Sequence, residues 1–160
     1  MKGHPEVITA LNECLTAELT AVHQYLLHAK ICENWGFARL AQEKLRESGE
    51  ERDDAEKLVG RILFLDGTPD VQRMDTVRIG DSVLEIQRSD LAMEVAHVER
   101  LNRAITLARD KGDNGTRELL EQILAGEEEA VDHLEAQLHL IEHLGPQVYL
   151  AEMMGPAAEA

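Results

Sequence analysis

Residues 5–34 have the sequence PEVITALNECLTAELTAVHQYLLHAKICEN, and this stretch decides the fold class. Its apolar residues recur every three or four positions, which is the spacing of one face of an α-helix, at Ile8, Leu11, Leu15, Val22 and Leu26. Glu18 falls inside that apolar stripe when successive residues are placed roughly 100° apart around the helix. Asn34-Trp35-Gly36 then breaks the pattern. The stretch therefore predicts an amphipathic helix with one carboxylate on its apolar side.

Three further segments show the same periodicity, and turn-forming residues end each of them. They span residues 37–65, 82–111 and 116–144, and Asp66-Gly67-Thr68-Pro69, Lys111-Gly112 and Gly145-Pro146 follow or end them. A short fifth helix is expected over residues 147–154. Aromatic residues make up only 3% of the chain and prolines number 4, which is poor for a β-sandwich and natural for long helices.

The link over residues 66–81 is far longer than the other links between the helices. Short links join antiparallel neighbours, whereas a link of this length can run along the whole bundle and make the second and third helices parallel. One long crossover is the ferritin-like arrangement, and an up-down-up-down bundle needs none. We therefore predict an all-α, ferritin-like four-helix bundle that forms a single domain over residues 1–160.

The composition narrows the range of partners and compartments. The chain has 31 acidic and 16 basic side chains and a net charge of −15, which argues against nucleic acid and against an anionic membrane surface. No apolar run approaches the ~20 residues that span a bilayer, and the N-terminal residues lack the apolar core of a signal peptide. Cys14 and Cys32 form no CxxC pair, so we expect no disulfide scaffold and a reducing cytoplasm.

Every predicted long helix carries at least one carboxylate near its middle on the apolar side. These residues are Glu18 in the first helix, Glu47 and Glu51 in the second, Glu94 in the third and Glu127 in the fourth. An unpaired buried carboxylate costs several kcal/mol, and carboxylates at one level repel one another. Lys44 is the nearest basic candidate partner. Metal ions that accept oxygen ligands solve the problem, as in bundles whose core holds two carboxylate-bridged metals.

Each acid taken alone is better explained by a surface groove or a subunit interface, but the coincidence across four helices favours a metal site. A di-iron bundle combines two carboxylates with two Glu-x-x-His pairs, and Glu94-x-x-His97 is the one such pair here. His97 lies at the edge of its stripe, so we expect a supporting or surface role for it. Asp54, three residues after Glu51, can ligate as a harder ligand, whereas Ala130 cannot ligate.

The sequence resembles the bacterioferritins over nearly its whole length. The resemblance rests on residues 1–13 (MKGHPEVITALNE), 18–29 (ELTAVHQYLLHA), 34–36 (NWG), 61–69 (RILFLDGTP), 88–95 (RSDLAMEV) and 140–150 (LIEHLGPQVYL). It implies a hollow shell of 24 subunits that oxidises Fe(II) and stores Fe(III) mineral. It also implies haem b at a two-fold subunit interface and allows a ferredoxin-type reductant as a partner for iron release.

The resemblance assigns site residues position by position. The family's four carboxylate ligands correspond to Glu18, Glu51, Glu94 and Glu127. Tyr25 matches a tyrosine near the family's di-iron site, while Asp54 and Ala130 stand where its two histidine ligands are expected. With Asp54 counted as a ligand, the expected iron ligands are Glu18, Glu51, Asp54, Glu94 and Glu127.

Two other family sites are also altered. Arg52 occupies the position of the haem-ligating methionine, and a guanidinium is not a ligand, which argues against haem b in this chain. His23 is a less favoured replacement ligand. Arg46 stands at the histidine of the family's inner-surface iron site, while Glu47 and Glu50 keep that stretch acidic.

We therefore predict an iron-storage and detoxification subunit with an incomplete di-iron site, whose Fe(II) oxidation depends on a second bacterioferritin subunit type in the same shell. If all 24 subunits were this chain, the formal charge would be 24 × −15 = −360, which would draw Fe(II) inward. The alternative is a working ferroxidase with Asp54 in place of histidine. A manganese oxidase or catalase, and a plain structural bundle with acids in grooves, are further alternatives.

Overall fold

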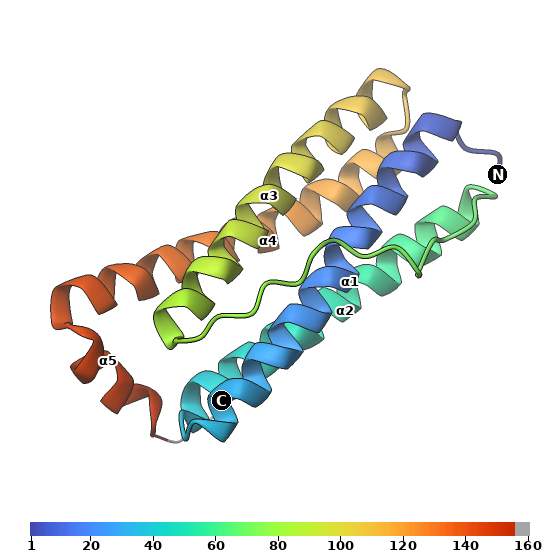
Figure 1. Ribbon diagram of the computed structural model, residues 1–160. Helices are drawn as coiled ribbons and strands as arrows, with labels where there is room; N and C mark the ends of the chain where they lie inside the picture. The colour runs from blue at the N-terminus through green and yellow to red at the C-terminus, as the bar shows by residue number, and fades with distance from the viewer. Residues whose placement is uncertain (156–160) are drawn as a thin grey trace.

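The computed structural model describes residues 1–155 and contains five helices in that range. They are α1 (Pro5–Asn34), α2 (Ala38–Phe64), α3 (Val83–Asp110), α4 (Asn114–Leu144) and α5 (Pro146–Met153) (Figure 1). The predicted four-helix bundle with a short fifth helix is confirmed, and the helix ends differ from the predicted ones by at most two residues. Residues 156–160 of the predicted domain lie outside the described range.

The four long helices form two antiparallel pairs. The α1 helix packs against α2, α3 packs against α4, and α1 also contacts α3. Helices α2 and α3 run parallel because the crossover between them returns along the full length of the bundle (Figure 1). Helix α5 contacts α4 and α2 at the end of the bundle where α1 turns into α2. Within the described residues, no helix has both the length and the apolar character needed to cross a membrane.

Local sequence signals explain where the helices begin. Pro5 occupies the first turn of α1, and the ring of His4 accepts a hydrogen bond from the Glu6 backbone N–H. Ser82 Oγ accepts from the backbone N–H of Glu85 at 3.2 Å and caps α3. Gly145 separates α4 from α5 at a φ of 79°, a backbone conformation that glycine adopts without steric cost.

The crossover is held against α1 by side chains of that helix. Asn12 Oδ1 accepts from the backbone N–H of Asp70 at 2.7 Å, and Thr20 Oγ1 accepts from that of Asp75 at 3.0 Å. Further along, Gln24 Oε1 accepts from the backbone N–H of residue 78 at 3.0 Å. These three acceptors are spaced by multiples of four residues, so they share one face of α1. The crossover has no regular secondary structure of its own, and these side-chain hydrogen bonds hold its backbone against α1.

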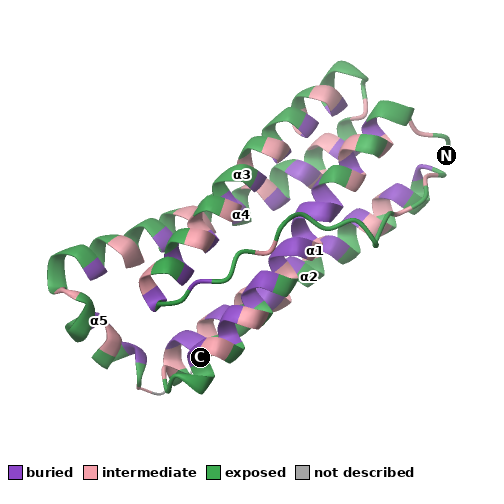
Figure 2. Ribbon diagram, in the orientation of Figure 1, coloured by how far each residue is buried: buried purple, intermediate pink, exposed green. Residues whose placement is uncertain are grey.

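The apolar core is divided into two parts, with polar residues buried between them. The larger part includes Leu11, Leu15, Leu58, Ile62, Leu101, Leu120 and Ile123. The smaller part lies near α5 and includes Cys32, Leu40, Ile86, Ile141, Tyr149 and Met153. Figure 2 shows the buried faces of the four long helices turned toward one another, whereas the crossover is mostly exposed. The candidate site lies among these buried polar residues, between the two apolar parts of the core.

Candidate metal centre

Four buried side chains, one from each long helix, meet between the two parts of the core. They are Glu18 of α1, Glu51 of α2, His97 of α3 and Glu127 of α4, and each offers one ligand atom within 4.8 Å of the others. We call these four residues the buried cluster. His97 Nε2 lies 3.4 Å from Glu18 Oε1, and His97 Nδ1 lies 3.5 Å from Glu127 Oε1. Three carboxylates and one imidazole at this spacing form a donor set suited to a transition metal.

The buried cluster contains an unusual number of polar atoms without a hydrogen-bond partner among the described residues. Both carboxylate oxygens of Glu18, both ring nitrogens of His97, and one oxygen each of Glu51 and Glu127 have none. Buried polar atoms in folded proteins are almost always paired, so each exception needs an explanation. Cations bound between these atoms would satisfy them, and the donor set present fits iron.

The pKa shifts of the carboxyl groups in the buried cluster also favour a bound cation. Burial, followed by the charge of Glu127, raises the pKa of Glu18 well above its usual value. Burial also raises the pKa of Glu51 well above its usual value, with Glu94 adding to the effect. A metal cation would reverse these shifts, because an opposite charge at short range favours the ionised carboxylate. Without a metal, these raised pKa values favour protonated carboxyl groups, and metal binding would displace the protons.

His97 is present in the form that binds metals. Burial, with the charge of Arg100 adding to it, lowers the pKa of His97 to about 3. The imidazole is therefore neutral at pH 7, and its contacts with Glu18 and Glu127 are not ion pairs. A neutral imidazole has a free lone pair and is the form found in metal sites.

The structure excludes one of the two roles expected for His97. The sequence pattern put it at the edge of the apolar stripe, with a supporting or surface role, and the surface role is wrong because only 2% of this residue is exposed. The helix packing closes over that edge, because α1 and α4 each bring a carboxylate to within 3.5 Å of the ring. The three-residue spacing between Glu94 and His97 was the available signal, since residues i and i+3 share a helix face.

Glu94 lies beside the buried cluster and is fully buried. Its Oε1 atom accepts a hydrogen bond from the hydroxyl of Tyr25, and its Oε2 atom has no hydrogen-bond partner among the described residues. Burial raises the pKa of Glu94 above its usual value. Tyr25 thus orients one oxygen of Glu94 and leaves the other available to a ligand.

Besides Glu94, two carboxylates that the sequence analysis singled out lie outside the buried cluster, and so does Ala130. Asp54 is partly exposed and pairs with Lys57 at 2.6 Å. Glu47, which the helical pattern placed on the apolar side of α2, is also only partly buried and pairs with Arg46 at 2.5 Å. Ala130 lines a cavity of only about 10 Å³ and contributes no ligand atom. The two positions where the resemblance implied histidine ligands therefore add no imidazole to the site.

Lys44, the nearest basic candidate in the sequence, pairs with an acid outside the buried cluster. Its Nζ atom pairs with Asp90 Oδ2 at 2.7 Å, and His28 Nδ1 lies 2.8 Å from Asp90 Oδ1. Burial by itself would raise the pKa of Asp90, but Lys44 and His28 more than offset it and hold that pKa below its usual value. All three side chains are almost completely buried. They form a separate polar network that stabilises the bundle next to the site.

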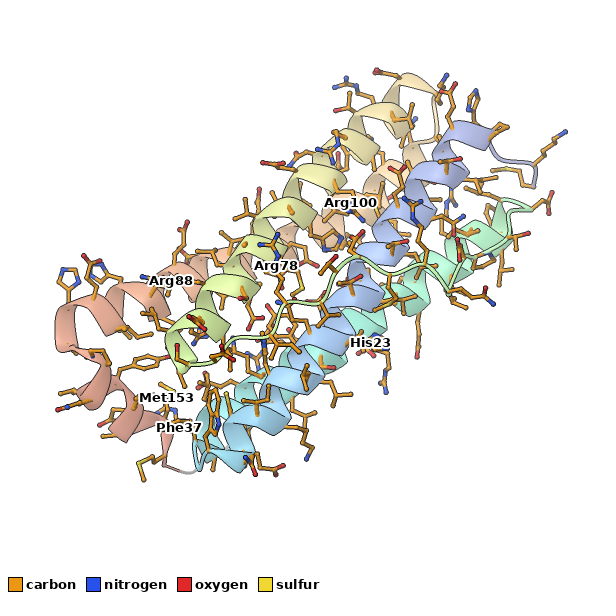
Figure 3. All side chains as sticks on the ribbon, in the orientation of Figure 1. His23, Phe37, Arg78, Arg88, Arg100 and Met153 are labelled. Atoms are coloured by element: carbon orange, nitrogen blue, oxygen red, sulfur yellow. The ribbon has the colours of Figure 1, made fainter. Side chains whose placement is uncertain are left out.

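A cleft reaches the buried cluster from the side of the crossover. It has a volume of about 300 Å³, lies between α1, the crossover and α3, and has His97 in its wall. Arg78 and Arg100, which also line it, lie on this side of the bundle (Figure 3). Arg100 pairs with Asp75 at 2.9 Å, which ties the crossover to α3. His97 is the one member of the buried cluster in the wall of this cleft, and its ring nitrogens are buried behind that wall.

The residues at the expected haem position do not fit an axial ligand. The side chain of Arg52 is 67% exposed and pairs with Asp53 at 3.2 Å. His23 is also exposed, and its Nδ1 atom lies 2.6 Å from the backbone oxygen of Leu19. A guanidinium has no lone pair to donate to haem iron, so the haem implied by the resemblance has no ligand at position 52.

A four-helix bundle with one long crossover and a carboxylate-rich centre defines a ferritin-like protein, and the comparisons agree with this class. The ferritin-like domain family matches residues 8–144. A bacterioferritin of Mycolicibacterium paratuberculosis is 49% identical over 141 residues, covering 88% of this chain and 89% of that protein. A bacterioferritin of Streptomyces coelicolor is 48% identical, covering 88% and 84%, and one of Brucella melitensis is 40% identical, covering 88% of each. The chain belongs to the bacterioferritin family.

Proposed function

We propose that the chain is an iron-storage and detoxification subunit of a hollow 24-subunit shell in the cytoplasm, and that its buried cluster binds iron. Membership of the bacterioferritin family supports the storage role. The net charge of −15 per chain favours the accumulation of cations, and the free, buried cysteines are consistent with a reducing compartment. The observation that carries the proposal is the set of unpaired carboxylate and imidazole atoms contributed by four helices.

The residues of the buried cluster would hold Fe(II) as the cargo entering the shell. Glu18, Glu51 and Glu127 supply oxygen ligands, and His97 supplies the one imidazole. Glu94, held by Tyr25, adds a further carboxylate at the edge of the site. Each carboxyl group that binds would release its proton, because its pKa is raised only while the cluster lacks a cation. The protein thus stabilises the cation mainly with negative charge.

We further propose that this chain oxidises Fe(II) slowly without a partner. One imidazole serves a site for which the family resemblance implies two, and Asp54 is engaged by Lys57 at 2.6 Å. The second iron should therefore bind weakly, and transfer of electrons from two irons to O2 should be slow. A second bacterioferritin subunit type in the same shell would then supply rapid oxidation.

A second candidate function is a working ferroxidase with a modified ligand set. The position of His97 within the buried cluster favours it, because one imidazole is restored from α3. Asp54 could add a carboxylate only by leaving Lys57, and that ion pair is weak because its ammonium side is exposed to solvent. The two candidates differ in how fast the chain oxidises iron without any other subunit.

Anaerobic Fe(II) titration followed by exposure to air separates these functions, using protein produced without any other bacterioferritin. Size exclusion of the same sample checks the shell. The proposal expects saturable Fe(II) binding at the buried cluster but slow oxidation. Glu127→Gln should abolish that binding, while Glu128→Gln, its exposed neighbour on α4, should leave it unchanged.

Each other outcome has a definite meaning. Fast, saturable oxidation at about two irons per subunit would support the ferroxidase and overturn the partner-dependent proposal. Unsaturable binding that Glu127→Gln does not change would overturn the assignment of the buried cluster as an iron site. A monomeric or dimeric protein in size exclusion would contradict the shell.

A further inference from the structure

His139 and His143 form an exposed pair near the end of α4 that the proposed function does not use. Their ring centroids lie 3.8 Å apart with 31° between the ring planes. Residues four apart share a helix face, so the backbone holds the two imidazoles side by side before any ligand arrives. His139 follows Glu127 by 139 − 127 = 12 residues, which is about 18 Å along the helix axis. The pair is therefore remote from the buried cluster.

The helix backbone fixes the tautomer of His143. Its Nδ1 atom lies 2.9 Å from the backbone oxygen of His139, and a carbonyl oxygen can only accept. Nδ1 therefore carries the hydrogen, which leaves the lone pair of the neutral ring on Nε2. Metal-binding histidines are oriented in the same way, by donating their other ring N–H to a carbonyl or carboxylate. His143 thus presents Nε2 as a ready metal ligand.

The surroundings of the pair favour a cation. Glu135, one turn before His139, and Glu142, next to His143, are both exposed. Both carboxylates line a groove between α3 and α4 that His139 also lines. Arg88 of α3, labelled in Figure 3, is the one arginine or lysine in this lining and is exposed. Two carboxylates face one guanidinium there, so the field beside the imidazoles is net negative.

We propose that His139 and His143 form a surface chelate for a divalent transition metal, separate from the buried cluster and independent of its proposed function. The Nε2 atoms provide two ligands, and water or a neighbouring carboxylate completes the coordination. Imidazole pairs favour Ni²⁺, Cu²⁺ and Zn²⁺, whereas Mg²⁺ and Ca²⁺ prefer sites made entirely of oxygen atoms. Two histidines four residues apart on a helix are also the zinc-binding element of other metal sites.

The test is calorimetric titration of the tag-free, assembled protein with Ni²⁺ in the presence of excess Mg²⁺. We expect His139→Gln and His143→Gln each to weaken Ni²⁺ binding at this site at least about tenfold, because losing a ligand costs no less than losing a residue that supports one. The double variant should weaken it no further than either single variant, since one remaining imidazole cannot chelate. His133→Gln is the matched control, because His133 is exposed on the same helix and has no histidine one turn away.

Three outcomes would overturn the proposal. The double variant could bind Ni²⁺ as tightly as the unchanged protein, His133→Gln could weaken binding as much, or the two single losses could simply add. The last outcome would mean two independent surface histidines. Fe(II) titration of the double variant should match that of the unchanged protein, so failure of this proposal is distinguishable from failure of the iron site.

Discussion

Replacing His97 with leucine should make the metal-free protein more stable while weakening its iron binding. The imidazole is 2% exposed, is neutral because its pKa is lowered to about 3, and has no hydrogen-bond partner for either nitrogen within residues 1–155. Leucine fills a similar volume without polar atoms. Glu18 and Glu127 lose no hydrogen bond, because neither makes one to the ring. The substitution thus removes a buried polar group without a partner and, with it, a proposed metal ligand.

The size of both effects follows from this geometry. A buried polar group without a partner costs about 1–3 kcal/mol, so the metal-free protein should gain about that much. For a chain of this length, each kcal/mol changes the unfolding midpoint by about 2–4 °C, which gives an increase of about 2–12 °C. Iron affinity should fall at least about tenfold, which corresponds to about 1.4 kcal/mol.

The assay is thermal unfolding of the assembled protein, metal-free and with Fe(II) under anaerobic conditions, at one fixed protein concentration. The unchanged protein should gain a large increase in midpoint on adding Fe(II), and His97→Leu should lose most of it. His28→Leu is the matched control. His28 is equally buried, but its Nδ1 atom lies 2.8 Å from Asp90. This control should lower the metal-free midpoint and keep the increase caused by Fe(II).

The reasoning would be refuted by the opposite pattern. If His97→Leu lowered the metal-free midpoint and retained the full increase with Fe(II), His97 would be an ordinary packing residue. The buried cluster would then have to bind iron through carboxylates alone, or not bind it at all.

Three further predictions follow from the same contacts. Burial raises the pKa of the cluster carboxyl groups, so their contribution to the stability of the metal-free protein is complete below about pH 4 and is lost as pH rises through the raised pKa values. The denaturant midpoint of the metal-free protein should therefore be lower at about pH 9 than at about pH 6. Adding Fe(II) should reduce that difference. Asp90→Asn should destabilise the protein by about 3–5 kcal/mol in denaturant unfolding, because it leaves the buried Lys44 ammonium without its anion; an effect under about 1 kcal/mol would contradict the ion-pair network. Asp54→Ala should change Fe(II) affinity less than about twofold in titration, because Asp54 pairs with Lys57 outside the cluster; a loss of tenfold or more would make Asp54 a ligand.

Much of the site was predictable because helical periodicity is a local property. Placing residues 100° apart was enough to put Glu18, Glu94 and Glu127 on the inner faces of their helices. Glu47 shows the limit of the method, because the same projection placed it on the apolar side and the structure leaves it partly exposed and paired with Arg46. A projection gives the direction of a side chain but not how far the neighbouring helix covers it.

The residues near the edges of the stripes were decided by packing between helices. His97 became part of the buried cluster because α1 and α4 close over the edge of α3. Lys44 pairs with Asp90 and not with the buried cluster, because the arrangement of α2 and α3 places Lys44 Nζ 2.7 Å from Asp90 Oδ2. Such contacts join positions far apart in the chain, and their distances depend on the rotation and spacing of whole helices.

The sequence by itself predicted the four helices, the parallel course of α2 and α3, and carboxylates on the inner faces of the helices, because periodicity, turn residues and charge are encoded locally. Only the tertiary structure decided that His97 joins these carboxylates in the buried cluster. The sequence places His97 at a stripe edge and excludes Ala130 as a ligand, but it does not give the distances of His97 and Asp54 from the carboxylates. The tertiary structure gives those distances, with His97 buried between Glu18 and Glu127, because they depend on how whole helices pack.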